Sequence, residues 1–249
     1  MAEKKPVENH KEEVPFSHYV DLFRALDPQE AAARTGAAFD GAAFTLRLVD
    51  RDYRICWPDY RLEAEEGSFA LKNLPAQTFL LRYLLEGKAV PALGTFKTFR
   101  EMPWGELYIQ PFTGRCLTRA AFTFGTKIPK FQAAMEKLGA EKLPHGDAGY
   151  ALELLPGFTM ELLVWAGDDE FPPSAQILYS DNFEQGFAPE DRVVAGDLLI
   201  SIVKTYLGYM GGPCGRPFLH PAIRPTRRGR CLHRPARQLL RTAQPSYIL

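Results

Sequence analysis

The sequence predicts an α+β fold, in which helices pack on a mainly antiparallel sheet within a single domain. Segments with strand periodicity come in adjacent pairs rather than alternating with helices, and this order favours antiparallel over parallel pairing. Hydrophobic residues make up 46% and aromatic residues 12% of the 249 residues, which is enough for a substantial core. We expect the globular part to span residues 14–209.

Helix signals open this part of the chain. Ser17 is placed to cap a first helix that carries an apolar stripe. Asp27, Pro28 and Glu30 then supply an N-cap, a first-turn proline and an acid at the third position. We expect Asp27 to accept a backbone N–H and Glu30 to reach back to the cap. This second helix is predicted to end near Thr35.

The hydrophobic period then changes to two, which is typical of strands. Residues 44–48 and 53–57 alternate and predict a hairpin, and residues 60–64 extend it by a third strand. The later predicted elements are helices over residues 73–85, 115–124, 130–138 and 189–207, and strands over residues 96–102, 150–155, 158–165 and 176–179.

Composition also indicates the cellular compartment. Residues 1–13 form a charged lead-in, expected to be disordered, without the apolar segment of a secretory signal. No apolar run reaches the roughly 18–20 residues that span a bilayer. The four cysteines include no C-x-x-C pair, which indicates free thiols in a reducing compartment. We therefore expect a cytoplasmic protein with no membrane contact.

Residues 210–249 form a tail that differs from the rest. Residues 211–249 hold eight arginines and no Lys, Asp or Glu, which leaves 22 basic and 30 acidic residues, a charge of −8, on residues 1–210. We favour a tail that is disordered or translated in a shifted reading frame. Two alternatives stay open. One is a basic arm for nucleic acid. The other is a zinc site, although its spacing fits no standard motif, formed by Cys214, His220, Cys231 and His233.

Three segments carry a resemblance to a known family. They are residues 74–84 (LPAQTFLLRYL), 99–108 (FREMPWGELY) and 165–179 (WAGDDEFPPSAQILY). Their order and spacing resemble the uncharacterised prokaryotic family called domain of unknown function family 3786, over about residues 17–207. The third segment is the most specific of the three.

The resemblance implies little chemistry. Some members resemble fusions with a cysteine-rich iron–sulfur module, which implies a link to anaerobic redox or one-carbon metabolism around corrinoid enzymes. This chain has no such cluster of cysteines. We therefore expect no iron–sulfur cluster on it, and the cofactor stays unknown.

An acidic run follows one predicted strand and precedes a Phe-Pro-Pro sequence. Asp168, Asp169 and Glu170 offer oxygen ligands that suit a hard cation, with Asp181 or Asp147 as further ligands. Neighbouring strand side chains point to opposite faces, so three in a row cannot converge without a turn. We therefore favour a capped turn whose carboxylates bind backbone N–H groups or an arginine, and we assign no metal site.

A second candidate surface lies on a loop broken by proline and glycine. Its arginine and aromatic side chains suit an anion or a planar ligand. The competing hypothesis is that Arg100 or Arg115 pairs with the acids of residues 168–170 and joins both loops into one polar cluster. The predicted ligand or partner surface comprises Arg100, Glu101, Trp104, Tyr108, Arg115, Asp168, Asp169, Glu170 and Phe171.

Catalytic motifs are mostly missing from the sequence. It has no G-x-S-x-G, no Walker A and no Rossmann glycine fingerprint. Cys116 and His145 are a conceivable nucleophile pair, but we interpret Cys116 as a small core residue on a helix.

These observations predict an accessory or binding module for a small ligand or partner protein rather than an enzyme. The alternative is a metal-assisted enzyme that uses Asp168, Asp169 and Glu170. A weaker alternative is nucleic-acid contact through the tail, which the acidic charge of residues 1–210 disfavours.

Overall fold

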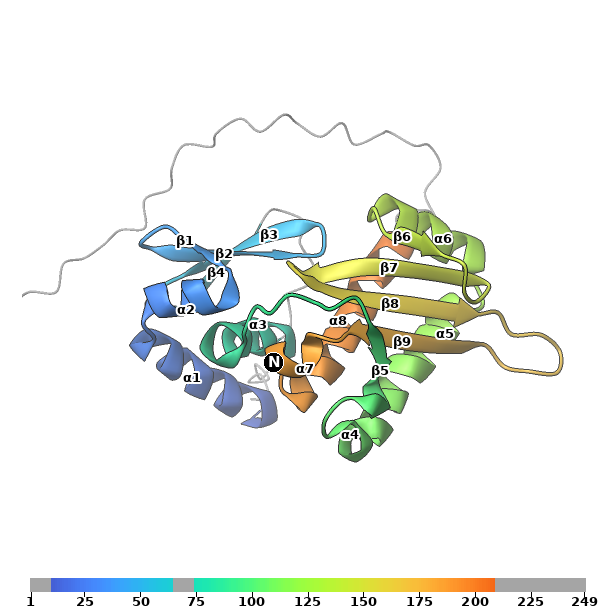
Figure 1. Cartoon of the computed structure of the whole chain (residues 1–249), viewed down its shortest axis with the longest axis horizontal. Helices are drawn as coiled ribbons and strands as arrows, with labels where there is room; N and C mark the ends of the chain where they lie inside the picture. The colour runs from blue at the N-terminus through green and yellow to red at the C-terminus, as the bar shows by residue number, and fades with distance from the viewer. Residues whose placement is uncertain (1–9, 65–73, 209–249) are drawn as a thin grey trace, which may run out of the picture. The chain divides into compact units, whose positions relative to one another are not determined.

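The computed structural model describes residues 10–64 and 74–208 (Figure 1). Residues 1–9 and the tail, with the four residues of the alternative zinc site, lie outside this described part. Within it, no helix is long and apolar enough to cross a membrane.

The predicted antiparallel pairing is confirmed, and it is divided between two sheets. The strands of the first are β1 (Ala38–Phe39), β2 (Ala43–Leu48), β3 (Arg51–Cys56) and β4 (Arg61–Ala64). Those of the second are β5 (Phe96–Thr98), β6 (Glu141–Leu143), β7 (Ala148–Leu155), β8 (Phe158–Trp165) and β9 (Ser174–Ser180). The helices are α1 (His10–Ala25), α2 (Pro28–Thr35), α3 (Leu74–Glu86), α4 (Gly105–Phe112), α5 (Arg119–Phe124), α6 (Ile128–Lys137), α7 (Phe183–Gly186) and α8 (Pro189–Gly208).

The four-stranded sheet is a meander in the order β1-β2-β3-β4. The predicted hairpin is its centre, where Phe44 faces Ile55 and Leu46 faces Tyr53 across the ladder. All four of these side chains are buried, so one face of the sheet contributes to the core. The alternation of apolar residues in the sequence reflects this single buried face.

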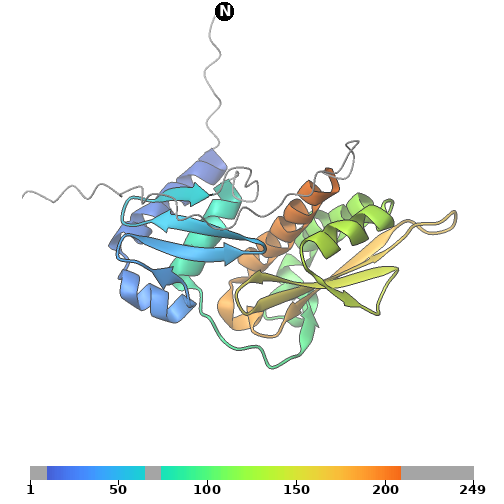
Figure 2. The same cartoon turned by 90° about the horizontal axis from the view of Figure 1, so that it is seen from above.

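The five-stranded sheet has the order β5-β9-β8-β7-β6. Seen from above, α5, α6 and α8 lie along one face of this sheet (Figure 2). On β8, the alternating residues Met160, Leu162 and Val164 are fully buried, while Thr159 and Glu161 on the other face are half-buried. The sheet therefore places its loops, including the one between β8 and β9, at the ends of a rigid core.

The N-terminal helices follow the predicted capping with two differences. Asp27 Oδ1 accepts hydrogen bonds from the backbone N–H groups of Gln29 at 2.9 Å and Glu30 at 3.2 Å, as expected. Glu30 does not reach back to the cap; its carboxylate pairs with Arg34 one turn later at 2.9 Å. The first helix begins at His10, ahead of Ser17.

The segment between residues 96 and 124 departs most from the prediction. The expected strand 96–102 ends at Thr98, and Phe99–Glu101 forms a 3-10 turn, η1. A continuous helical segment then runs through α4, a π-helical stretch η2 (Thr113–Thr118), and α5. Pro111 lies inside α4 and has no N–H to donate, which is a physical reason for the irregular turn that follows it.

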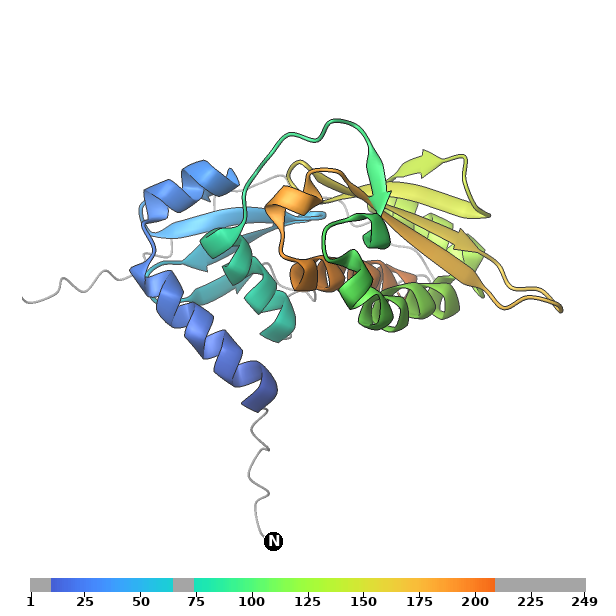
Figure 3. The ribbon, with the colours of Figure 1, turned by 60° about the horizontal axis from the view of Figure 1, so that its bottom comes forward.

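A long connection joins the two sheets, running from α3 over α7 to β5 (Figure 3). Residues at the end of β9 hold it in place. Asp181 accepts hydrogen bonds from the backbone N–H groups of Leu93 at 2.9 Å and Thr95 at 3.2 Å, and Asn182 donates to the carbonyl of Val90 at 2.7 Å. The loop geometry is thus fixed by side chains almost ninety residues away in the sequence.

Candidate functional site

The acidic loop between β8 and β9 is a capped turn. Asp168 Oδ1 accepts hydrogen bonds from the backbone N–H groups of Glu170 at 2.9 Å and Phe171 at 2.7 Å. These bonds, to Phe171 first and Glu170 second, lower the pKa of Asp168. The Asp168 backbone N–H in turn donates to the carbonyl of Phe171 at 2.9 Å. Of the two predicted forms of the turn, the structure contains the one in which a carboxylate binds backbone N–H groups.

This turn presents an aromatic side chain to solvent. Phe171 is 67% exposed although its backbone is held by hydrogen bonds at both its N–H and its carbonyl. Phe122 on α5 is 60% exposed. A groove of about 200 Å³ lies beside Phe122, and Phe171 directly precedes Pro172 in its wall. It is lined by Leu117, Thr118, Ala121, Phe122, Pro172, Pro173, Ser174 and Ala175. We call it the Phe122–Phe171 groove.

Close backbone contacts fix the two walls of the groove. A Cβ on Gly125 would lie 2.5 Å from the Cβ of Pro173 and 2.9 Å from the carbonyl oxygen of Trp165. Only glycine fits there, so the end of α5 contacts the base of the β8–β9 loop directly. The groove is therefore formed by packed elements rather than by a loose loop.

The β8–β9 loop, whose end supplies one wall of the groove, carries acids whose charge is not neutralised by a neighbour. Asp169 and Glu170 are exposed, and within residues 10–64 and 74–208 their carboxylates form no ion pair or hydrogen bond. Asp168 adds a third negative charge on the same turn. The groove thus combines exposed apolar side chains with a local acidic field.

The second candidate loop is ordered by its own contacts. Glu101 Oε2 accepts hydrogen bonds from the backbone N–H of Thr98 at 2.7 Å and from its hydroxyl at 2.8 Å. These bonds lower the pKa of Glu101. Arg100 Nε lies 3.0 Å from Glu106 Oε2, and both side chains are exposed. Glu101 therefore shapes the η1 turn, and Arg100 belongs to a surface ion pair.

Trp104 lies in the left-handed region with φ 63° and is 71% exposed. A bulky residue in this region is strained by about 1 kcal/mol or more. Its neighbour Gly105 cannot carry a side chain, because a Cβ there would lie 2.0 Å from the carbonyl oxygen of Phe99. The tight return of the chain holds this indole outward, next to the 70%-exposed Leu107.

Tyr108 and Arg115 turn toward α8. The Tyr108 hydroxyl donates to Glu190 Oε1 at 2.5 Å, which raises the pKa of Tyr108. Arg115 Nη2 lies 3.6 Å from Asp197 Oδ2, and Arg119 binds the other oxygen of that carboxylate. Both predicted residues therefore connect the α4–α5 segment to the last helix.

The predicted pairing between the two loops is wrong. Arg100 and Arg115 take Glu106 and Asp197 as partners, and Asp168 takes backbone N–H groups. Figures 1 and 3 show the β8–β9 loop and α4 apart in both views. Arg100 pairs with an acid at the start of α4 and Arg115 with an acid on α8, so the nine predicted residues divide into separate surfaces.

The other acids considered as cation ligands are also occupied. Asp147 Oδ2 accepts the backbone N–H of Ala166 at 2.8 Å, and Asp181 holds the long connection described above. In the described part of the chain, no group of three or more His, Cys, Asp or Glu side chains is placed to hold a metal ion.

Cys116 is the small core residue that the sequence predicts. Its side chain is fully buried, and Sγ donates to the carbonyl of Val193 at 3.4 Å. Burial raises the pKa of this thiol to about 12, so it stays protonated at neutral pH.

Sequence reasoning missed the residues that complete the groove. The sequence pattern places Leu117 and Phe122 on a predicted helix, 115–124, and assigns them no site. The signal was present: Phe122 and Phe124 flank a single residue in α5, so they cannot both face the core. Phe124 is fully buried and Phe122 is exposed.

The family model described as Domain of unknown function (DUF3786) matches residues 27–201. The chain belongs to this family. Searches of curated proteins and of solved structures find no match. The family membership predicted from three segments is thus confirmed, while the expected link to corrinoid metabolism stays a prediction.

Proposed function

We propose that this protein is an accessory module that binds a partner protein through the Phe122–Phe171 groove. The observation that carries the proposal is a groove with fixed walls, lined by Phe122, which is 60% exposed, and by Pro172, which directly follows the 67%-exposed Phe171. Exposed aromatic side chains on an ordered surface are typical of binding hot spots, because their burial releases the most water for the least loss of side-chain freedom.

The groove favours a particular kind of partner. Its volume of about 200 Å³ accommodates a single apolar side chain rather than a drug-sized molecule. The free carboxylates of Asp169 and Glu170 favour lysine or arginine beside that anchor. We therefore expect a partner segment with one apolar anchor and flanking basic residues.

The proposal is tested by affinity capture from native lysate with matched variants of the full chain. Phe122→Ser and Phe171→Ser are expected each to lose a partner that the unchanged protein retains. Leu93→Ser is the control, because Leu93 is 89% exposed and lies on the long connection instead of the groove.

Charge reversal on the β8–β9 loop distinguishes specific binding at the groove from nonspecific adsorption. Asp169→Lys with Glu170→Lys is expected to weaken capture of the same partner at low salt and to change little at high salt. A partner retained equally by both serine variants and by the charge-reversed protein would show that the groove is not its binding site.

A further inference from the structure

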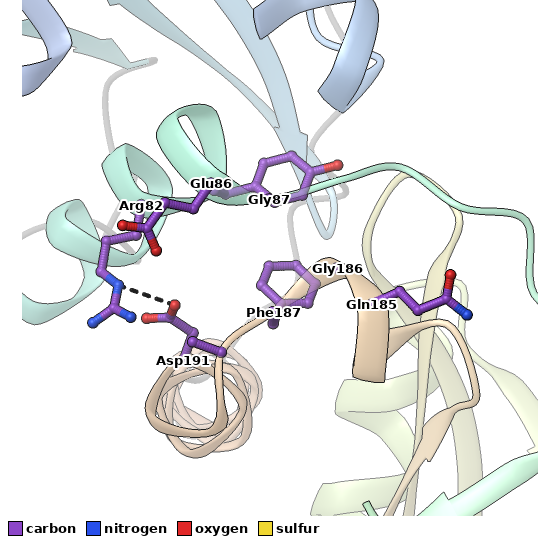
Figure 4. A pocket seen from close by; sticks show the side chains of 9 residues that line it. Arg82, Glu86, Gly87, Gln185, Gly186, Phe187 and Asp191 are labelled. Atoms are coloured by element: carbon purple, nitrogen blue, oxygen red, sulfur yellow. Dashed lines mark ion pairs between the residues drawn. The ribbon is translucent and has the colours of Figure 1, made fainter. Parts of the chain in front are cut away.

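A second concave site lies where α3 meets the start of α8. It is a pocket of about 210 Å³ lined by Arg82, Tyr83, Glu86, Gly87, Gln185, Gly186, Phe187, Ala188 and Asp191. Figure 4 shows the side chains of Arg82, Glu86 and Asp191 facing one another, with Phe187 as the adjoining wall. Two segments about a hundred residues apart in the sequence form this pocket.

The only guanidinium lining the pocket already has partners. Arg82 Nε lies 3.1 Å from Asp191 Oδ2, and Arg82 Nη1 lies 3.4 Å from Glu190 Oε2. The same group lies over the ring of Tyr19, 5.4 Å from its centroid. An incoming anion would have to displace Asp191 or Glu190, so Arg82 does not present an open anion site.

The pocket has more carboxylates than the single positive charge of Arg82 can neutralise. Glu86, one turn beyond Arg82 on α3, forms no ion pair or hydrogen bond within the part of the chain that the structure describes. The charged side chains that line the pocket are Arg82, Glu86 and Asp191, a sum of −1 when Asp191 is ionised. Arg34, beside the pocket, donates to the carbonyl of Gly87 and pairs with Glu30. Arg192 turns away and donates to the carbonyls of Phe187 at 3.1 Å and Pro103 at 2.8 Å. The charge that is left uncompensated in the pocket is therefore negative.

Part of the remaining wall is apolar and rigid. The Phe187 ring stacks on Phe79 and on Tyr83, with ring centroids 5.2 Å apart in each pair. A Cβ on Gly186 would lie 2.4 Å from the ring of Phe158, so the backbone there needs glycine to pack this closely. A small carbon body fits against this wall while a charged end faces the acids.

We propose that this pocket binds a compact organic cation, an ammonium group on a short apolar chain, with Glu86 and Asp191 as its carboxylate ligands and Phe187 as its apolar wall. A free amine and a lysine side chain share this chemistry. The site is separate from the Phe122–Phe171 groove and does not depend on the function proposed for the groove.

Binding at this site is coupled to the protonation of Asp191. The Asp191 side chain is only 9% exposed, and burial, opposed by Arg82 and Arg192 and reinforced by Glu190 and Glu86, raises its pKa to about 7. Tyr19 from α1 and Tyr108 from α4 complete the surroundings. Because a cation prefers the ionised carboxylate, affinity rises with pH through 7.

The test is an NMR titration of the full chain with propylammonium, with propanol and butyrate as neutral and anionic probes of similar size. We expect saturable shifts at the Gly87 and Gly186 amides with propylammonium alone. Between pH 8 and pH 6 its affinity should fall roughly fivefold to tenfold, following ionisation of a group with a pKa near 7. A second titration uses blocked lysine methylamide, which carries a lysine side chain. Tighter binding of this probe than of propylammonium indicates a lysine side chain as the ligand, and weaker binding indicates a free amine.

Variants locate the binding. Glu86→Gln lies on the rim and should abolish saturable binding without unfolding the protein. Asp191→Asn should bind weakly and without pH dependence. Glu106→Gln, an exposed acid on α4, and Phe171→Ser should bind as the unchanged protein does. Binding of butyrate in place of propylammonium, or full binding by Glu86→Gln, would overturn the proposal.

Discussion

Two acidic regions of this molecule use the same residue type in opposite ways. In the β8–β9 loop, Asp168 is exposed and its pKa is lowered by backbone N–H groups. In the pocket between α3 and α8, Asp191 is buried and its pKa is raised to about 7 by loss of water. The first carboxylate shapes the backbone, and the second holds a titratable charge beside a cavity. The surroundings, more than the residue, decide the role.

The largest expected effect concerns a buried arginine compared with an exposed one. Arg192 is 2% exposed and donates to the backbone carbonyls of Phe187, just after α7, and Pro103, before α4. Arg192→Met should lower the free energy of unfolding by about 2–4 kcal/mol, because buried carbonyls lose their donors. Arg100→Met removes only an exposed ion pair and should change the free energy of unfolding by less than about 0.5 kcal/mol.

Urea denaturation followed by circular dichroism measures both variants under the same conditions. Equal losses for Arg192→Met and Arg100→Met would show that Arg192 does not tie α7 and α8 to the start of α4.

The second prediction concerns the pH dependence of stability. The pKa of Asp191 is about 4 in the unfolded chain and about 7 in the folded one. Its stabilising contribution is therefore complete below pH 4 and is lost as the pH rises to about 7. Relative to Asp191→Asn, the unchanged protein should lose about 2 kcal/mol between pH 5.5 and pH 8.

Unfolding curves for both proteins at the two pH values give this difference directly. If the two proteins respond to pH in parallel, burial does not control the ionisation of Asp191 in the folded state.

The third prediction compares two neighbouring acids in the β8–β9 loop. Asp168 receives two backbone hydrogen bonds, while Asp169 has an uncommitted carboxylate in the described structure. Asp168→Ala should speed proteolytic cleavage within residues 166–173 by roughly threefold or more, because local opening of the turn becomes easier. Asp169→Ala should leave the rate unchanged. Mass spectrometry of timed digests gives both rates, and equal acceleration would mean that the cap does not hold the turn.

The smallest expected effect is on stability in the groove. Phe122→Ser and Phe171→Ser change side chains that are mostly in water, so the free energy of unfolding should move by less than about 0.5 kcal/mol. Thermal unfolding of both variants checks this. A large loss in either would mean that the ring supports the fold, and its exposure would no longer argue for a partner.

Sequence reasoning succeeded where local chemistry determines the structure. The Asp27 cap and the 44–57 hairpin follow from neighbouring residues and from a period of two, and both are present. It failed where geometry overrides the local pattern. Two-residue β1 and three-residue β6 are too short to show a period. Residues 105–112 contain Gly and Pro, which argue against a helix, yet α4 forms there.

The candidate sites divide along the same line. The Asp168 turn was predictable, because an aspartate can bond to backbone N–H groups two and three residues ahead. The partner of Arg115 was not, because only the tertiary fold brings Asp197 of α8 near it. Arg82 and Asp191 looked like ordinary helix residues, since the pocket exists only where α3 meets α8.

The strand order has a consequence for how the chain folds. Strands β1 to β4 pair only with sequence neighbours, whereas β5 pairs with β9, with Phe96 opposite Ser180. Contacts between distant residues cost more loop-closure entropy and tend to form late. The meander should therefore assemble early, and the docking of β5 and its connection should come near the end. Because Asp181, Asn182 and the wall of the pocket formed by residues 185–191 follow β9 directly, while the other wall lies on α3, formation of the pocket between α3 and α8 should mark one of the last steps of folding.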